Sequence, residues 1–230
     1  MSETSTADAP RSKQFLLAVP EARALEWIAR RLPRRVMPDH LTALGVLASI
    51  GIAAAYVLSN GDKAWLWAAS ALLVVHWLGD SLDGTLARVR KAERPRYGFY
   101  LDHLVDAFAT AAIGIGLGLS PYMLLAVGLA IVVAYLILSI NTYLETQALG
   151  TFSLGYGLIG PTEVRLLLVA LNTALALGFA PHALVAGATL GLFDFAGAAV
   201  IALMSTALAL RAARNLRELA RREPAQSALS

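Results

Sequence analysis

The apolar residues of this chain are grouped into six long runs that short polar stretches separate. The runs cover residues 41–59, 63–88, 98–119, 121–145, 162–180 and 194–212. A helix needs about 20 mostly apolar residues to cross the hydrocarbon core of a bilayer, and each run is close to that length. Backbone groups in lipid must find their hydrogen bonds within the spanning segment, which favours helices. The pattern predicts an all-α integral membrane protein, a bundle of six transmembrane helices.

A shorter amphipathic segment precedes the first run. Over residues 21–32, Leu25, Ile28 and Leu32 fall on one face of a helix, with Trp27 beside them and charged residues opposite. Such a helix can lie in the headgroup layer of a membrane; a plain solvated helix is the alternative. The expected organisation has four parts: a disordered N-terminus at 1–13, an interfacial juxtamembrane helix at 14–36, a six-helix domain at 37–213 and a basic tail at 214–230.

Composition agrees with the membrane class. Of the 230 residues, 57% are hydrophobic and 15% are charged, whereas about 25% of the residues of a soluble domain are charged. The net charge of +3 comes from basic clusters beside the apolar runs, where they can meet anionic lipid. We therefore expect membrane lipids as partners and no nucleic acid.

Basic residues gather on alternate connections between the runs. They precede the first run, separate the second from the third, and follow the sixth: Arg30, Arg31, Arg34, Arg35; Arg88, Arg90, Lys91, Arg94, Arg96; Arg211, Arg214, Arg217, Arg221, Arg222. The opposite connections carry only Lys63. Because basic loops stay in the cytoplasm, both termini and residues 79–107 are predicted to be cytoplasmic, in a protein of a bacterial inner membrane.

Four aspartates interrupt the apolar pattern within residues 79–107. One face of the second predicted helix carries Asp80, Asp83, Gly84, Ala87 and Arg88. One face of the third carries Gly98, Asp102 and Asp106. Residues that recur every three or four positions share a helix face. A loop of nine residues joins the two helices, so we expect antiparallel neighbours whose four carboxylates converge at their cytoplasmic ends.

Such a pocket needs positive charge. An aspartate at mid-membrane costs about 2.5–3.5 kcal/mol, and four close together also repel one another. Arg88 supplies one positive charge, whereas two divalent ions supply four. Carboxylate oxygens suit Mg²⁺, Mn²⁺ or Ca²⁺, and a pair of ions can hold both oxygens of a phosphoryl transfer. We expect two divalent cations, Mg²⁺ or Mn²⁺. A cation transporter or channel and a structural salt-bridge network are the alternatives.

The aspartate stretch resembles the signature of the CDP-alcohol phosphotransferase family, also called CDP-alcohol phosphatidyltransferases. That signature is Asp-x-x-Asp-Gly-x-x-Ala-Arg followed by Gly-x-x-x-Asp-x-x-x-Asp, and residues 80–88 and 98–106 hold every fixed position. The connection between the halves has nine residues, where the family usually has eight. Residues 38–42, PDHLT, are similar to a Pro-Asn-x-x-Thr-like element of the family, with Asp39 in place of asparagine.

The resemblance implies a membrane-embedded transferase of phospholipid biosynthesis. It would move a phosphatidyl or other substituted phosphate group from a CDP-alcohol to an acceptor hydroxyl and release CMP. The donor would be a CDP-linked lipid or aminoalcohol, and the acceptor a lipid or small alcohol. The resemblance implies metal ligands, a CDP-alcohol site and a general base: Asp80, Asp83, Asp102 and Asp106 for the metals; Gly84, Ala87, Arg88, Thr42 and Asp39 for the donor; Asp106 for the base.

Weaker signals surround this stretch. Arg165 and Glu163 begin the fifth run on the same side as the aspartates, where Arg165 can bind an acceptor phosphate or lipid headgroup. A snorkelling arginine or a local ion pair is the alternative. His103 points away from the carboxylate face, and His76 lies one turn before Asp80. Small residues at 114–120 and 196–200 permit close helix contacts and leave a homodimer open.

Overall fold

The structure, a computed structural model, describes residues 18–150 and 160–224. The predicted disordered N-terminus at 1–13 therefore lies outside the described residues. The described chain forms helices and one small hairpin: α1 Ala18–Ala29, α2 Pro38–Leu58, α3 Trp65–Val89, α4 Pro95–Gly118, α5 Leu125–Leu149, α6 Pro161–Ala176, β1 His182–Val185, β2 Ala188–Gly191 and α7 Leu192–Arg222. Each of the six apolar runs coincides with one of the helices α2 to α7.

The fold is mainly helical and has the character of a membrane protein. Four of the described helices are long and apolar enough to cross a membrane: α2, α4, α5 and α7. The predicted count of six spans is not confirmed. The other two are α3, whose second half carries Asp80, Asp83 and Arg88, and α6, which has only 16 residues.

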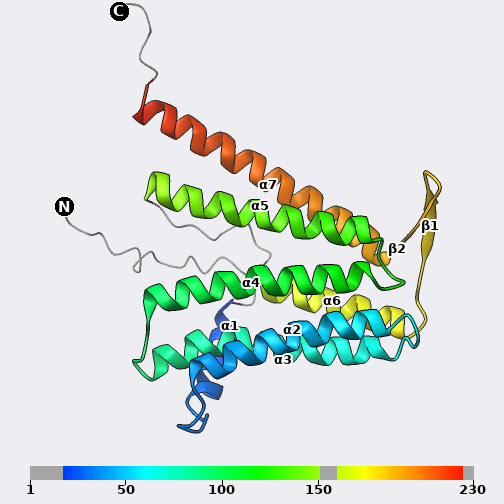
Figure 1. Cartoon of the computed structure of the whole chain (residues 1–230), viewed down its shortest axis with the longest axis horizontal. Coiled ribbons are helices and arrows are strands. Elements are labelled where there is room, and N and C mark those ends of the chain that lie inside the picture. Colours follow the sequence, from blue (N-terminus) through cyan, green and yellow to red (C-terminus); the bar gives the residue numbers. More distant parts are fainter. Residues whose placement is uncertain (1–17, 151–159, 225–230) are drawn as a thin grey trace, which may run out of the picture.

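The long helices pack side by side, with their axes along a common direction (Figure 1). The principal helix neighbours follow the order α6, α3, α2, α4, α5, α7. The core between them contains Ile52 and Tyr56 of α2, Leu66 and Leu73 of α3, and Phe193 of α7. The loop between α3 and α4 lies at one end of the bundle, and the hairpin lies at the other (Figure 1).

Small residues set the closest helix contacts. A Cβ atom on Gly79 of α3 would lie 2.7 Å from the backbone nitrogen of Gly45 on α2. A Cβ atom on Gly116 of α4 would lie 2.5 Å from the Cα of Ala53, also on α2. Neither distance is sterically possible, so glycine is required for α2 to approach both helices this closely. The small residues predicted at 114–120 therefore make contacts within the chain.

Helix α1 exists, but its apolar face packs on the protein. Leu25 and Ala29 are buried with Leu41 of α2 and with Leu82 and Leu86 of α3. The interfacial placement predicted for this segment is not confirmed, because the protein covers Leu25 and partly covers Ile28 and Leu32, although Trp27 is 59% exposed.

One carboxylate fixes helix α1 to two other helices. Glu21 Oε1 accepts hydrogen bonds from Trp77 Nε1 of α3 at 2.6 Å and from Thr162 Oγ1 of α6 at 2.9 Å. Glu21 therefore connects α1 to both α3 and the first turn of α6.

A buried polar network joins three helices in the middle of the bundle. Tyr56 donates its hydroxyl hydrogen to Asn172 Oδ1 at 3.1 Å, and Asn172 Nδ2 donates to Ser70 Oγ at 3.1 Å. Tyr56 and Asn172 have no solvent exposure. The network fixes α6 against α2 and α3, because a buried polar group without a partner costs about 1–3 kcal/mol.

Candidate active site

Three of the four predicted aspartates meet between α3 and α4. One carboxylate oxygen each of Asp80, Asp102 and Asp106 lies within 4.8 Å of the others. Asp102 and Asp106 are one turn apart on α4, so their side chains share a face. All three residues are partly buried. The predicted convergence of carboxylates from two helices is therefore present in the structure for these three.

The cluster lies farther along its helices than the apolar runs indicated. Helix α4 begins at Pro95, and proline is well suited to the first turn of a helix. Asp106 is eleven residues after Pro95, about 16 Å along the axis at 1.5 Å per residue. Asp80 is nine residues before the end of α3 at Val89. The carboxylates consequently face the interior of the bundle and do not lie at helix ends.

Arg165 of α6 lies at the same cluster. Its Nη2 is 2.6 Å from Asp80 Oδ2, and the two side chains are only 15% and 20% exposed. The arginine that the sequence suggested for an acceptor phosphate is thus beside the carboxylates. One guanidinium balances only part of the charge of three ionised carboxylates. The oxygen donors that remain are those that Mg²⁺ and Mn²⁺ prefer, so the residues fit a divalent cation.

Asp83 does not belong to the group of three, contrary to the predicted convergence of all four carboxylates. Its Oδ2 accepts a hydrogen bond from Thr42 Oγ1 of α2 at 2.6 Å, and its Oδ1 accepts one from the backbone N–H of Gly84 at 2.5 Å. Three residues turn a helix by about 300°, so Asp83 points about 60° away from Asp80. Helix α2 lies on that side, and its Thr42 binds the carboxylate. Thr42 was predicted to bind the donor; it contacts Asp83 here, and its donor contact stays a prediction.

The glycines of the signature border open space. A Cβ atom on Gly84 would meet only Arg88 Nη1, at 3.4 Å, and a Cβ atom on Gly98 would meet nothing within 4 Å. Gly84 and Arg88 are exposed, and Ala87 is half-buried. Arg88 also donates from Nη2 to Thr85 Oγ1 at 3.0 Å. This face of α3 can therefore accept a ligand without displacing other residues.

Two other predicted binding residues have local structural partners. Asp39, at the start of α2, forms an ion pair with Arg94 just before α4. The hydrogen bond to the Asp39 carboxylate raises the pKa of the Arg94 guanidinium above its ordinary value, so Arg94 stays charged. Glu163 Oε2 accepts the backbone N–H of Gly160 at 2.9 Å and so caps the start of α6. Donor contact by Asp39 and acceptor contact by Glu163 stay predictions.

The two histidines differ in their surroundings. His103 Nδ1 is 3.8 Å from Asp102 Oδ2 and 2.7 Å from the Phe99 carbonyl oxygen, and the ring contacts Tyr143 edge-on. It therefore lies beside the cluster, as its position in the sequence suggested. His76 is buried at 5% exposure, and its Nδ1 has no hydrogen-bond partner among the described residues.

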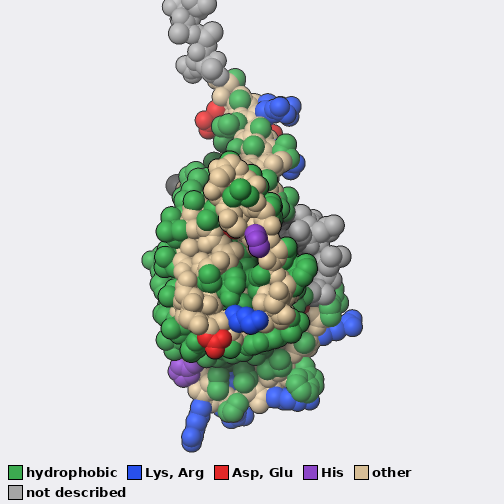
Figure 2. Space-filling view, turned by 90° about the vertical axis from the view of Figure 1, so that its right-hand side faces the viewer, with side chains coloured by type: hydrophobic (Ala, Val, Ile, Leu, Met, Phe, Trp, Pro, Cys, Tyr) green, Lys and Arg blue, Asp and Glu red, His purple; other side chains and the backbone are tan. Residues whose placement is uncertain are grey.

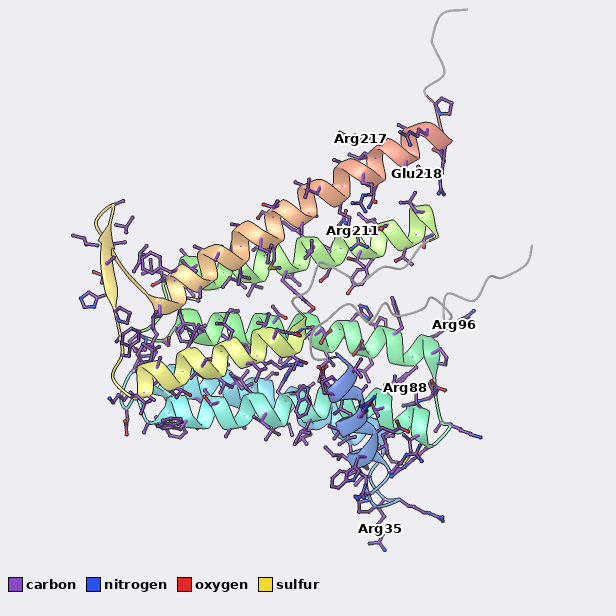
Figure 3. All side chains as sticks on the ribbon, turned by 180° about the vertical axis from the view of Figure 1, so that it is seen from behind. Arg35, Arg88, Arg96, Arg211, Arg217 and Glu218 are labelled. Atoms are coloured by element: carbon purple, nitrogen blue, oxygen red, sulfur yellow. The ribbon has the colours of Figure 1, made fainter. Side chains whose placement is uncertain are left out.

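A buried ion pair between α5 and α7 escaped the sequence analysis. Arg211 Nε is 2.5 Å from Glu145 Oε2, with side chains 12% and 9% exposed. Figure 3 shows Arg211 between these two helices, with Arg217 and Glu218 farther along α7. Glu145, Arg217 and Glu218 line a cavity of about 630 Å³. Arg211 was counted only among the basic residues that follow the sixth apolar run, and Glu145 was assigned no role.

Fold and site together define a mainly helical membrane protein with a carboxylate cluster inside its bundle. The family model for CDP-alcohol phosphatidyltransferases matches residues 35–193, more than half of the chain. The chain belongs to this family, which confirms the resemblance noted from residues 80–106. Helix α1 and most of α7 lie outside the matched range.

The chain is also similar to a curated relative. It is 33% identical over 99 residues to a phosphatidylinositol phosphate synthase of Cutibacterium acnes. The matched part covers 43% of this chain and 45% of the relative, so the two are comparable over less than half of either length.

Proposed function

We propose that this protein transfers a substituted phosphate group from a CDP-linked alcohol to an acceptor hydroxyl in phospholipid biosynthesis and releases CMP. The observation that carries the proposal is the group of Asp80, Asp102 and Asp106 with Arg165 against it, in a chain of this family. Its carboxylates can bind cations and accept a proton, and its guanidinium can bind a phosphate.

Asp80, Asp102 and Asp106 would hold the divalent cations, and Asp83 would join them after it leaves Thr42. Bound Mg²⁺ or Mn²⁺ would supply positive charge that stabilises the pyrophosphate and the departing CMP. The supporting observation is the donor set itself, since its oxygen ligands lie within 4.8 Å of one another.

The residues of this chain have separate tasks in the proposed reaction. Gly84, Ala87 and Arg88 would hold the CDP part of the donor on the open face of α3. Asp106 would accept the proton of the acceptor hydroxyl while that oxygen forms a bond to the phosphorus bearing the alcohol. The bond from this phosphorus to the CMP oxygen breaks, and the proton passes from Asp106 to solvent.

We further propose a phosphorylated acceptor alcohol and CDP-diacylglycerol as donor. Arg165 supports this choice, because a guanidinium binds a phosphate through two parallel hydrogen bonds and lies beside Asp80. The name of the relative from Cutibacterium acnes agrees with an inositol phosphate as acceptor. CDP-aminoalcohol donors are the competing choice.

The proposed topology has six spans, with the aspartates toward the cytoplasm of a bacterial inner membrane. The labelled arginines of Figure 3, among them Arg88, Arg96 and Arg217, lie on the half of the molecule away from the hairpin. Basic residues concentrate on the cytoplasmic side, so this half and the end of α7 would face the cytoplasm. A homodimer stays a prediction. The family match does not favour the alternative of a cation transporter or channel.

The test uses purified full-length protein in lipid vesicles. CMP release is followed with CDP-diacylglycerol or CDP-aminoalcohols as donors, inositol phosphate, glycerol phosphate or their unphosphorylated forms as acceptors, and added Mg²⁺ or Mn²⁺. We expect release with CDP-diacylglycerol and a phosphorylated acceptor, and its loss with EDTA. Absence of metal-dependent release with every pair would contradict the enzyme; release only with unphosphorylated acceptors would contradict the proposed role of Arg165.

A further inference from the structure

The hairpin of β1 and β2 lies at the end of the bundle opposite the aspartates. Its strands pair His182 with Gly191, Ala183 with Leu190, Leu184 with Thr189 and Val185 with Ala188. Ala186 and Gly187 connect them with φ values of 50° and 83°, the positive values that a tight two-residue hairpin turn requires. Figure 1 shows the hairpin running crosswise to the long helices, so it lies along the plane of a membrane that the helices would cross.

The two faces of the hairpin differ in polarity. Residues opposite each other in an antiparallel pair share a face, and successive residues alternate between faces. One face is therefore entirely apolar: Ala183, Val185, Ala188 and Leu190. The other combines apolar and polar groups: His182, Leu184, Thr189 and Gly191. No charged residue occurs between Arg165 and Asp194.

The apolar face begins on the protein and continues outward. Leu190 and Ala188 are half-buried, whereas Val185 near the tip is 47% exposed. Leu177 and Phe179, which connect α6 to the hairpin, are 75% and 64% exposed. The end-on view of Figure 2 shows mostly hydrophobic and backbone surface, with few charged side chains. Since an isolated two-stranded hairpin is at best marginally stable in water, this apolar surface needs a partner.

The open edges of the hairpin limit the depth at which it can lie. It follows α6, whose 16 residues span about 24 Å, and lies at the end of the bundle away from the loop between α3 and α4 (Figure 1). Open strand edges carry unpaired N–H and C=O groups, which do not occur within the hydrocarbon itself. The hairpin needs water for its strand edges and an apolar partner for its apolar face. The headgroup layer offers both, because water reaches it and the acyl chains begin beneath it.

We propose that the hairpin lies flat in the headgroup layer of the leaflet opposite the aspartate cluster, with the face of Val185 toward the acyl chains. Trp65 and Trp67 at the start of α3 are also exposed at this end of the bundle. Aromatic side chains of this kind collect at membrane interfaces.

Asp194 holds the base of the hairpin in this orientation. Its Oδ2 accepts the backbone N–H of Gly191 at 2.9 Å, and its Oδ1 accepts that of Leu124 at 2.8 Å. The hairpin is thus tied to the start of α7 and to the residue before α5. The proposal depends on no step of the proposed reaction.

The absence of cysteine allows a direct test. Val185→Cys and Thr189→Cys place single nitroxide labels on opposite faces of the hairpin in the full-length protein. Two references complete the set: Leu47→Cys on α2, which is 66% exposed, for lipid, and Gly61→Cys, an exposed turn position, for water. Each variant is reconstituted into vesicles of phosphatidylcholine and phosphatidylglycerol. Power saturation then compares accessibility to oxygen and to a water-soluble nickel chelate.

We expect the oxygen-to-nickel ratio at residue 185 to be several-fold higher than at residue 189 and to approach that of residue 47. A ratio at 185 equal to that of residue 61 would overturn the proposal, because the hairpin would then project into water. Spin–spin broadening at 185 that disappears on dilution with unlabelled protein would also overturn it. That result would show a hairpin paired with a second copy of the chain.

Discussion

Two regions of the bundle use their carboxylates differently. Inside the half away from the hairpin, Asp80, Asp102 and Asp106 converge beside the single guanidinium of Arg165. At the hairpin end, both oxygens of Asp194 accept backbone N–H groups and complete the local structure. A carboxylate whose oxygens are occupied by the backbone supports the fold. Three carboxylates that converge beside one arginine can bind a cation, which is why we locate the chemistry there.

The largest expected effect comes from Asp106→Asn. If Asp106 accepts the acceptor proton, the rate of CMP release should fall by about 10²–10⁴-fold, the usual contribution of a general base. The measurement is initial rate in vesicles at saturating Mg²⁺ or Mn²⁺. Asp62→Asn is the matched control at the opposite end, where Asp62 Oδ1 accepts the backbone N–H of Ala64 at 2.8 Å. Full turnover of Asp106→Asn would exclude the proton-acceptor role.

Arg165→Ala should have the next largest effect. Loss of a charge-assisted hydrogen bond costs about 1.5–3 kcal/mol, roughly 10–100-fold in apparent affinity for a phosphorylated acceptor. We expect KM for the acceptor to rise while KM for the donor changes little. Arg31→Ala serves as control, because Arg31 stacks on Trp27 of α1 at 3.8 Å from the ring centroid. Equal rises in both KM values would indicate that Arg165 serves only the structure of the cluster.

The buried network between the ends should affect stability more than chemistry. Asn172→Ala leaves the buried Tyr56 hydroxyl without its partner, whereas Ser70 keeps its bond to the Leu66 carbonyl oxygen, and the free energy of unfolding should drop by about 1–3 kcal/mol. Thermal unfolding in detergent measures this change. Thr206→Ala removes a hydroxyl that bonds to the Ala202 carbonyl oxygen on exposed α7, and it should change stability by less than about 0.5 kcal/mol. If Asn172→Ala and Thr206→Ala lowered the free energy of unfolding by similar amounts, the buried network would contribute no more to stability than an exposed hydroxyl does.

Glu21→Ala should have the most local effect of the four. It removes two hydrogen bonds that join α1 to α3 and α6, each worth about 0.5–1.5 kcal/mol. We expect faster hydrogen exchange of the α1 backbone amides. Glu26→Ala removes an exposed ion pair with Arg30 on the same helix and tests whether any lost carboxylate has this effect. If the α1 backbone amides exchange at the same rate in Glu21→Ala and Glu26→Ala, Glu21 does not fix α1 to its neighbours.

Several features were predictable because they depend on residues close together in the chain. The apolar runs gave the positions of α2 to α7, since a helix that crosses lipid must be apolar over most of its length. The spacing of Asp102 and Asp106 put them on one face, because residues four apart lie one above the other. The signature residues identified the family.

Other features depend on how helices approach one another. Asp83 shares its sequence motif with Asp80, yet its carboxylate accepts a hydrogen bond from Thr42 of the neighbouring α2 and is not among the three that converge. Glu145 and Arg211 are 66 residues apart, and no periodicity relates positions on different helices.

The sequence by itself determined the class of protein, the helix positions and the residues of the candidate site, because hydrophobic pattern and helical period act within one element. Only the tertiary structure decided that Arg165 reaches Asp80, that α1 packs on the bundle and that a hairpin joins α6 to α7. These outcomes depend on contacts such as that of Gly79 with Gly45, where backbone shape sets the distance between helices. Side-chain partners across elements follow from that distance.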